Sequence, residues 1–438
     1  MEESPPHYID VSQLRKGLFV QLDLGWMDHP FPKGSFKISS SEQIATIRSL
    51  GLTQVRYHPD KSDPPGGDAQ PTGPGELDQA SGTAAAPAFA PEVRPLSPEA
   101  QARKQHADQL GAQQRSLMAC ERRFGEATRQ YRKVMEQVSS SPEQAHRNSV
   151  ELVGGCVSEL LADGESAIRL LTETMGDRNA MHPVNVMVVS LLLGKALGLS
   201  AQELTDLGQA ALLHDLGKMD LPDRVRLFDD HFNAAEYKMY QEHVTCSVAL
   251  GKRMGLAPHV LVAIAQHHEL ADGSGFPLHL KGDRLGVGGK ILALVNRYDN
   301  LCNPPKVALA MTPHEALSLI FAQMKSRFDS VTLGAFIRMM GVYPPGSVVQ
   351  LVNDRFAMVV SVNSSRPLRP RVIVHDPAVP KDEALIIDLE HAPELGIRRS
   401  LKPMQLPKSA LDYLSPRQRV CYFFERAADP DHPAGAPS

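Results

Sequence analysis

Two pairs of adjacent polar residues follow apolar helical patterns in the middle of the chain. In ELTDLGQAALLHDLGK, apolar residues recur at helical spacing up to Ala211, and the next turn brings His214 and Asp215. In PHVLVAIAQHHE, the corresponding turn brings His267 and His268. Because burial of unpaired polar or charged groups costs free energy, we expect such groups from different helices to share a bound metal.

Two further histidines lie in similar helical surroundings. His182 opens the apolar run VNVMVVSLLL, and His243 lies in YQEHVTCS. Either histidine alone would fit an ordinary hydrogen-bonded core residue, so the adjacent pairs carry the metal interpretation. Five imidazoles and one carboxylate suit a transition metal, whereas calcium and magnesium prefer oxygen ligands. A carboxylate among these histidines could bridge two ions, and two ions about 3.5–4 Å apart can hold both an attacking hydroxide and a scissile phosphate.

Lys218 follows His214 by one helical turn and allows two interpretations. Its ammonium group could reach a phosphate oxygen. Alternatively, it is a solvated lysine favoured by the dipole at the end of a helix.

The composition excludes several classes of protein. A net charge of −4 provides no overall basic field, so we expect no nucleic-acid polymer as partner. The five cysteines are scattered without a CxxC pair, which argues against a disulfide framework or a cysteine-rich zinc site. The longest apolar stretch, VMVVSLLLGKALGL, contains Lys195 and is too short to span a bilayer. We therefore expect a cytoplasmic protein without a membrane partner.

The sequence pattern divides the chain into segments of different kinds. Residues 1–58 alternate short apolar runs with turns around one helical pattern, which predicts a small α+β domain. Residues 59–97 are rich in Pro, Gly, Ala and Ser, which predicts a disordered linker. The remaining segments are expected to be a polar helix at 98–140, a helical domain at 141–340, a β-rich domain at 341–425 that ends in a helix, and a disordered tail at 426–438.

The long polar helix needs a partner to be stable. Either it packs on its own domain, or it associates with a second copy of the chain or with a signalling protein. The sequence leaves these alternatives open.

The motifs quoted above carry a resemblance to a known family. The His-Asp pair of ALLHDLGK, with His182 upstream and His243 downstream, resembles the HD superfamily of metal-dependent phosphohydrolases. HHELADGSGFP resembles the HHExxDGxGYP motif of the HD-GYP subfamily. The resemblance spans about residues 142–340, and residues 7–58 resemble more loosely a small domain that precedes some bacterial HD-GYP modules. The expected architecture is multidomain, with a central all-α HD-type helical domain between a small α+β domain and a small β-rich domain.

The resemblance implies an activity and a set of site residues. It implies hydrolysis of cyclic di-GMP, a bacterial second messenger, to pGpG or on to GMP at a centre of two iron or manganese ions. It implies that Asp215 bridges the ions and that Lys218 contacts the scissile phosphate. The implied metal ligands are His182, His214, Asp215, His243, His267, His268 and Asn296. The implied substrate contacts are Lys218, Gly273, Gly275, Phe276, Pro277 and Lys306, where the glycines allow tight turns and the proline fixes the exit of the loop.

Four positions depart from the family pattern. Asn296 occupies the place of the last aspartate ligand and brings no charge. Arg178 replaces the glutamate of three-metal members, which predicts at most two ions. Phe276 replaces the tyrosine of the GYP motif, and Lys306 is the only cation where the family often carries an Arg-Pro-Tyr-Arg stretch. Three functions stay open: an active cyclic di-GMP phosphodiesterase, a degenerate module that binds nucleotide, metal or a protein partner, and an HD phosphohydrolase of another nucleotide.

Overall fold

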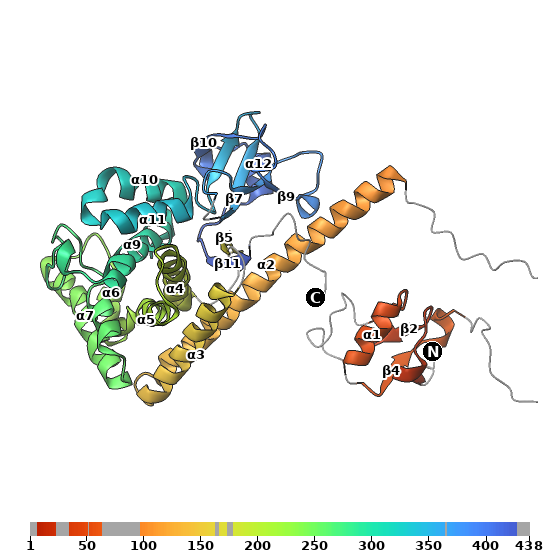
Figure 1. Cartoon of the computed structure of the whole chain (residues 1–438), viewed down its shortest axis with the longest axis horizontal. Coiled ribbons are helices and arrows are strands. Elements are labelled where there is room, and N and C mark those ends of the chain that lie inside the picture. The colour runs from red at the N-terminus through yellow and green to blue at the C-terminus, as the bar shows by residue number, and fades with distance from the viewer. Residues whose placement is uncertain are drawn as a thin grey trace, which may run out of the picture. The chain divides into compact units, whose positions relative to one another are not determined.

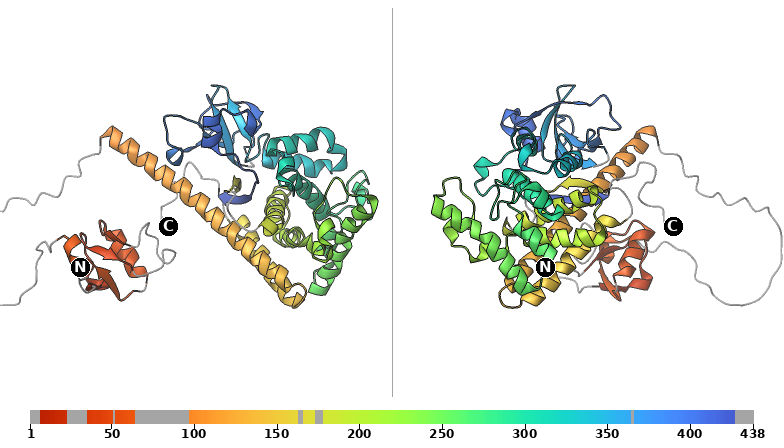
Figure 2. Two further views of the ribbon diagram at one scale, coloured as in Figure 1. Left: turned by 180° about the vertical axis from the view of Figure 1, so that it is seen from behind. Right: turned by 60° about the vertical axis from the view of Figure 1, so that its left-hand side comes forward.

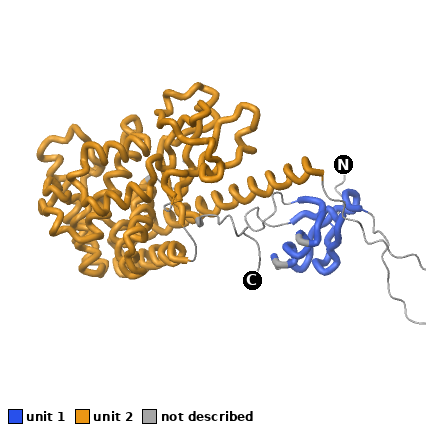
Figure 3. Tube along the Cα trace, turned by 45° about the horizontal axis from the view of Figure 1, so that its top comes forward, with its two compact units in different colours: residues 1–93 blue, residues 94–438 orange. Residues whose placement is uncertain are grey.

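The computed structural model divides the chain into two compact units, residues 1–93 and 94–438 (Figures 1 and 3). Part of the expected linker, residues 64–96, and the expected tail from residue 427 lie outside the described residues. The structure describes residues 7–22, 35–50, 52–63, 97–162, 166–172, 178–363 and 366–426.

The described part of the N-terminal unit is a small α+β fold, as expected. Its strands form an antiparallel sheet in the order β1–β4–β2–β3. Ser40 caps helix α1 through a reciprocal capping box with Gln43, and Ile47 of that helix is fully buried. The elements are β1 (His7–Asp10), η1 (Val11–Gln13), β2 (Phe19–Gln21), β3 (Ser35–Lys37), α1 (Ser41–Ser49), β4 (Gln54–Tyr57) and η2 (Pro59–Lys61).

The second unit begins with the long polar helix, α2 (Pro98–Gln137), which Ser97 caps. The first turns of α2 are exposed and extend beyond the other helices of this unit (Figure 2). Its second half packs against α3 (Pro142–Leu161) and buries Phe124 and Val134. The second half of α2 therefore finds its partner within its own unit.

A cluster of helices follows α3 and contains the site. Capping boxes at Ser200, Asn233 and Thr312 define the starts of three of these helices. None of the described helices combines the length and the apolar character that a membrane span requires. The elements are α4 (Arg178–Ala196), α5 (Ala201–Leu213), η3 (Leu216–Asp220), α6 (Asp223–Arg226), α7 (Ala234–Met254), α8 (Pro258–Ala265), η4 (Gly282–Arg284), α9 (Val287–Cys302), η5 (Val307–Leu309), α10 (Pro313–Gln323), η6 (Lys325–Arg327) and α11 (Ser330–Met340).

The C-terminal strands share one sheet with a strand from the helical region. The described strands of this antiparallel sheet run in the order β10–β6–β7–β5–β11, with β8 on β7 and β9 on β8. Strand β5 (Ser166–Leu170) lies between β7 and β11, so the β-rich region is joined to the helical region by backbone hydrogen bonds. The other elements are β6 (Val348–Leu351), β7 (Phe356–Asn363), β8 (Arg371–Val374), η7 (Lys381–Glu383), β9 (Ile386–Asp388), β10 (Ile397–Leu401), η8 (Pro403–Gln405), α12 (Lys408–Leu414) and β11 (Tyr422–Arg426).

The prediction of a helix at the end of the β-rich region is wrong, because Tyr422–Arg426 form strand β11. Pairing with β5 and burial of Phe423 and Phe424 stabilise the extended conformation. Local helical periodicity could not reveal this distant partner strand.

Candidate metal centre

Five histidines and Asp215 from several helices and loops gather in the second unit. Their ligand atoms form two groups, and within each group these atoms lie within 4.8 Å of one another. Asp215 belongs to both groups, so its carboxylate lies where it could bridge two ions. One group is Asp215, His243, His267 and His268, and the other is His182, His214 and Asp215.

Three of the histidines are oriented by their own helical turns. The Nδ1 atoms of His214 and His267 lie 2.7 and 2.6 Å from the carbonyl oxygen three residues earlier, and Nδ1 of His243 makes the same contact. Because a carbonyl oxygen only accepts, each Nδ1 must carry the hydrogen. The lone pair of each ring is therefore on Nε2, which is the atom in the cluster. Hydrogen bonds of this kind fix the tautomer of histidines that bind metals.

His182 is oriented by a carboxylate from another helix. Its Nδ1 donates to Oδ2 of Asp299 at 2.6 Å, and its Nε2 lies 3.6 Å from Asp215 Oδ2. The sequence motifs assigned Asp299 no role. Its position one turn after Asn296 on α9 was the available signal.

Several polar atoms at the centre of the cluster lack protein partners. The Nε2 atoms of His182, His214 and His268, and Oδ1 of Asp215, are buried without a hydrogen-bond partner among the described residues. Such atoms are rare in folded proteins because each one carries a desolvation cost. Four atoms of this kind, all able to bind a metal, fit a transition-metal site.

The protonation states also suit metal binding. Burial lowers the pKa of His243 to about 4 and the pKa values of His267 and His268 well below their usual range. These imidazoles are therefore neutral near pH 7. Burial opposes ionisation of Asp215, but the interactions of its carboxylate with His214 and with the Lys218 ammonium group outweigh burial and hold the Asp215 pKa well below its usual range. Neutral imidazoles and an ionised carboxylate are the forms that coordinate metals.

A close contact between η3 and α7 sets the position of Asp215. A Cβ on Gly217 would lie 2.1 Å from the carbonyl oxygen of His243, and the Gly217 amide donates to Ser247 Oγ at 2.8 Å. Only glycine permits this approach, which leaves Asp215 Oδ1 3.5 Å from His243 Nε2. Sequence reasoning missed Gly217, although it lies between Asp215 and Lys218 in the quoted motif.

Lys218 lies beside the shared carboxylate. Its Nζ is 2.6 Å from Asp215 Oδ2 and 5.6 Å from the centre of the Tyr240 ring. Burial opposes its charge, but Asp215 outweighs burial and raises the Lys218 pKa. A permanent cation therefore borders the centre.

The GSGF loop is held against the cluster by steric and polar contacts. Gly273 has a φ of 82°, and a Cβ on Gly275 would lie 2.4 Å from the Leu270 nitrogen, so both positions favour glycine. Phe276 stacks on His268, with ring centres 4.4 Å apart and planes at 20°. The peptide bond from Phe276 to Pro277 is cis.

Glu269 supports the loop and was not singled out from the sequence. Its buried carboxylate accepts hydrogen bonds from the backbone nitrogens of Leu278 and Leu280, at 2.6 and 2.8 Å. These bonds fix the far end of the loop. The available signal was the acid that directly follows the histidine pair.

The structure does not bring Lys306 into the cluster. Its Nζ pairs with Asp229 at 2.7 Å, and its side chain is 58% exposed. Asn296 is buried on α9, where its Oδ1 accepts from Asn300 at 2.6 Å. The roles of Lys306 and Asn296 therefore stay predictions. The side chain of Arg178 lies outside the described residues.

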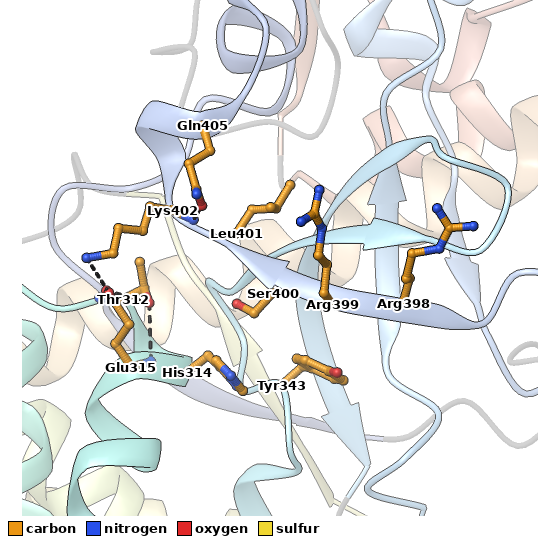
Figure 4. A pocket seen from close by; sticks show the side chains of 10 residues that line it. All are labelled: Thr312, His314, Glu315, Tyr343, Arg398, Arg399, Ser400, Leu401, Lys402 and Gln405. Carbon is orange, nitrogen blue, oxygen red and sulfur yellow. Dashed lines mark hydrogen bonds and ion pairs between the residues drawn. The ribbon is translucent and has the colours of Figure 1, made fainter.

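A pocket of about 450 Å³ lies elsewhere, between the start of α10 and strand β10 (Figure 4). It shares no residue with the histidine cluster. Its Lys402 pairs with Glu315 at 2.8 Å, and its Arg398 pairs with Asp354, so these cations already have acidic partners. We assign this pocket no ligand. It is lined by Thr312, His314, Glu315, Tyr343, Arg398, Arg399, Ser400, Leu401, Lys402 and Gln405.

Two family models match the chain. Residues 156–331, which include all the clustered histidines and Asp215, match the model of the HD domain. The chain contains an HD domain. The segment before it, residues 7–148, matches a domain of unknown function, DUF3391. This HD domain thus follows a second recognised domain, and the resemblance to the HD superfamily inferred from the sequence motifs is confirmed.

Similar proteins include named phosphodiesterases. A cyclic di-GMP phosphodiesterase of Pseudomonas aeruginosa is 26% identical over 84% of this chain and 84% of its own length. The cyclic di-GMP phosphodiesterase response regulator RpfG of Xanthomonas campestris is 31% identical over 34% of this chain and 40% of its own length. A 3'3'-cGAMP-specific phosphodiesterase of Vibrio cholerae is 31% identical over 30% of this chain and 25% of its own length.

Proposed function

We propose that this chain is an HD-GYP phosphodiesterase that hydrolyses cyclic di-GMP to pGpG, GMP or both, with two iron or manganese ions. One observation carries the proposal: two groups of side chains that could hold a metal share Asp215, and buried ring nitrogens in both groups have no hydrogen-bond partner among the described residues. The HHELADGSGFP motif and the names of the similar proteins support the choice of substrate. The proposal includes action in the cytoplasm. Association of α2 with a second copy or with a signalling protein remains a prediction.

The residues of the cluster divide between two ion positions in this proposal. One ion would be held by His243, His267 and His268 together with Asp215. The other would be held by His182, His214 and Asp215, with the Asn296 amide oxygen as a further, uncharged ligand. When bound, such ions stabilise negative charge on a phosphate and activate water as a nucleophile.

The chain supplies charge and positioning around that chemistry. Lys218 provides a fixed cation that would stabilise the negative charge developing on the phosphate oxygens. The Phe276 ring covers one face of His268 and keeps water from that side of the ring. Glu269 holds the loop that carries Phe276, because it binds two backbone amides beyond the loop.

A binding module with little turnover is the second candidate. It is favoured by Asn296, which adds no charge to the group around His182, and by Lys306, which is paired with Asp229. In that case the chain would bind metal and nucleotide, and restoring the carboxylate by Asn296→Asp would increase both metal content and turnover.

A substrate panel tests the proposed activity. Cyclic di-GMP, 3'3'-cGAMP, a (p)ppGpp and a dNTP are offered to the manganese-loaded protein, and products are separated by chromatography. We expect pGpG or GMP from cyclic di-GMP at the highest kcat/KM. His267→Ala should abolish the reaction, whereas His259→Ala, which removes a surface histidine paired with Asp206, should leave it unchanged. Faster hydrolysis of another nucleotide would contradict the proposed substrate.

A further inference from the structure

The segment that leads into the C-terminal strand β11 is held by two buried asparagines. The Val420 carbonyl accepts hydrogen bonds from Asn185 Nδ2 of α4 at 2.7 Å and from Asn303 Nδ2, just after α9, at 2.9 Å. The bonds are reciprocal. The Val420 nitrogen donates to Asn303 Oδ1 at 2.8 Å, and the Tyr422 nitrogen donates to Asn185 Oδ1 at 2.9 Å. The two amides therefore fix β11 and the residue pair before it to α4 and to the end of α9.

The same two amides also bind the carboxylate that orients His182. Asn185 Nδ2 and Asn303 Nδ2 donate to Asp299 Oδ1 at 3.0 and 2.9 Å. The other oxygen of Asp299 accepts from His182 Nδ1 at 2.6 Å. All three side chains that connect β11 to His182 are buried, so water competes little for these bonds.

This arrangement distinguishes His182 from the three histidines that are oriented by carbonyls of their own turns. His243 and His267 are oriented by carbonyls of their own turns, and their positions need no distant element. The orientation of His182 instead depends on Asp299, which is held by residues that also hold β11. A displaced β11 would therefore disturb the His182 side of the centre first.

The far end of β11 is fixed as well. Glu425 accepts hydrogen bonds from Ser116 of α2 at 2.8 Å and from Ser361 of β7 at 2.9 Å. Arg169 and Arg371 lie 3.6 Å from the same carboxylate. The strand is thus a short, doubly anchored connection between α2 and the metal centre.

We propose that Asn185 and Asn303 are positioning residues that couple docking of β11 to metal binding at the group His182, His214 and Asp215. The inference rests on the proposed two-ion centre and deepens it. We call the ion at His243, His267 and His268 the first ion and the ion at His182 and His214 the second ion. The affinity for the second ion depends on a C-terminal strand that contributes no ligand, whereas the affinity for the first ion does not depend on that strand.

Calorimetric titration of the metal-free full chain with Mn²⁺ tests this coupling. We expect the wild type to bind two ions. In Asn303→Ala, the first ion should bind with wild-type affinity. The second ion should bind about 10-fold more weakly, which is the smallest loss of metal affinity typical when a residue that orients a metal ligand is replaced. Asn148→Ala is the control, because the Asn148 side chain likewise donates and accepts hydrogen bonds, with Gln137 and Gln144, but lies on α3.

The outcomes separate the coupling from the proposed function. Two ions bound with wild-type affinity by Asn303→Ala would overturn the coupling and leave the metal centre intact. A wild type that binds no Mn²⁺ would instead overturn the proposed function. If thermal unfolding shows that Asn303→Ala is not folded, Asn303→Leu provides the same comparison, because leucine has a similar volume and no hydrogen-bonding group. Wild-type affinity for both ions in that variant also overturns the coupling.

Discussion

His214, His243 and His267 present the same nitrogen to the centre because each uses its other nitrogen for a carbonyl of its own helical turn. The ligand geometry is therefore built into the backbone before any ion binds. Removal of one ligand leaves the remaining rings in position, so we expect metal loss to be local and the fold to persist.

Asp215 and His267 provide the first prediction at the residue scale. Asp215→Ala and His267→Ala should each reduce metal content by at least one ion, because the first removes the shared carboxylate and the second removes a ligand nitrogen. Elemental analysis of the purified variants measures this. Full metal content in His267→Ala would show that the ligand set is wrong.

Lys218 provides a second prediction, which separates catalysis from metal binding. Lys218→Met should keep the metal content and lower kcat by about 10²–10³, as expected for loss of a group that stabilises charge in the transition state. Lys402→Met is the control, since Lys402 makes a similar ion pair with Glu315 away from the cluster. An unchanged kcat in Lys218→Met would exclude a catalytic role for this lysine.

Asn296 provides a third prediction. It lies one turn before Asp299 on α9, so both side chains lie on the same face of the helix. Asn296→Asp adds a negative charge without a change in shape and should raise the affinity for the second ion. Calorimetry with Mn²⁺ measures this. Equal affinities in the variant and the parent would show that the asparagine does not limit metal binding.

At the residue scale, the sequence predicted the clustered side chains better than the residues that hold them in position. The six clustered side chains could be predicted because adjacent polar pairs at the ends of apolar helical patterns are unusual. Asp299 and Asn185 could not be assigned, because their roles arise from contacts between helices that are distant in sequence. The expected contact of Lys306 with substrate stays a prediction, and in the structure Lys306 pairs with Asp229.

At the scale of the elements, the approach of η3 to α7 determines where Asp215 lies. Gly217→Ala would place a methyl group against the backbone of α7, so the two elements would have to separate. We expect a decrease of about 1–3 kcal/mol in the free energy of unfolding, typical of overpacking. We also expect weaker metal binding, because Asp215 and His243 would move apart.

Gly154→Ala is the matched control for this prediction. Gly154 lies inside α3 and has open space around the position of a Cβ. Alanine there should stabilise the helix by about 0.5–1 kcal/mol. Urea unfolding of the metal-free proteins measures both effects, and equal stability of the two variants would contradict the steric role of Gly217.

The sequence predicted a helix or strand correctly where the interactions that stabilise it lie within a few residues of one another. Ser40 and Ser97 make interactions of this kind, because each caps its helix through a hydrogen bond to a backbone nitrogen of the first turn. The prediction of a helix at Tyr422–Arg426 was wrong because this segment pairs with β5, a strand that precedes most of the helical region in the sequence. No local pattern in Tyr422–Arg426 records that pairing.

At the scale of the whole molecule, Glu425 joins α2, β5, β7 and β8 through one buried carboxylate. Glu425→Gln would leave Arg169 buried without its anionic partner. Loss of one partner of a buried ion pair costs about 3–5 kcal/mol, so we expect a large decrease in the free energy of unfolding. Urea unfolding of the variant and the wild type measures this decrease.

An exposed ion pair provides the comparison for Glu425→Gln. Asp354 and Arg398 are both largely exposed, and exposed pairs contribute about 0–1 kcal/mol. Asp354→Asn should therefore change the free energy of unfolding by less than 1 kcal/mol. A loss in Glu425→Gln no larger than the loss in Asp354→Asn would contradict the structural role of the buried network.

The division into segments also shows what sequence patterns cannot supply. The change from helical to β-rich character near residue 341 was visible, and it suggested a separate domain. Strand β5 instead inserts into the C-terminal sheet from the helical side of this boundary. Composition describes what a segment can form, whereas its partners are determined by the tertiary fold.

The central claim is that Asp215 is shared between two ions in an active phosphodiesterase. Metal content and cyclic di-GMP turnover measured on the same anaerobically purified sample test it most directly. We expect about two iron or manganese ions per chain together with formation of pGpG or GMP. One ion or none, without turnover after the protein is reconstituted with metal, would contradict it and favour a binding module.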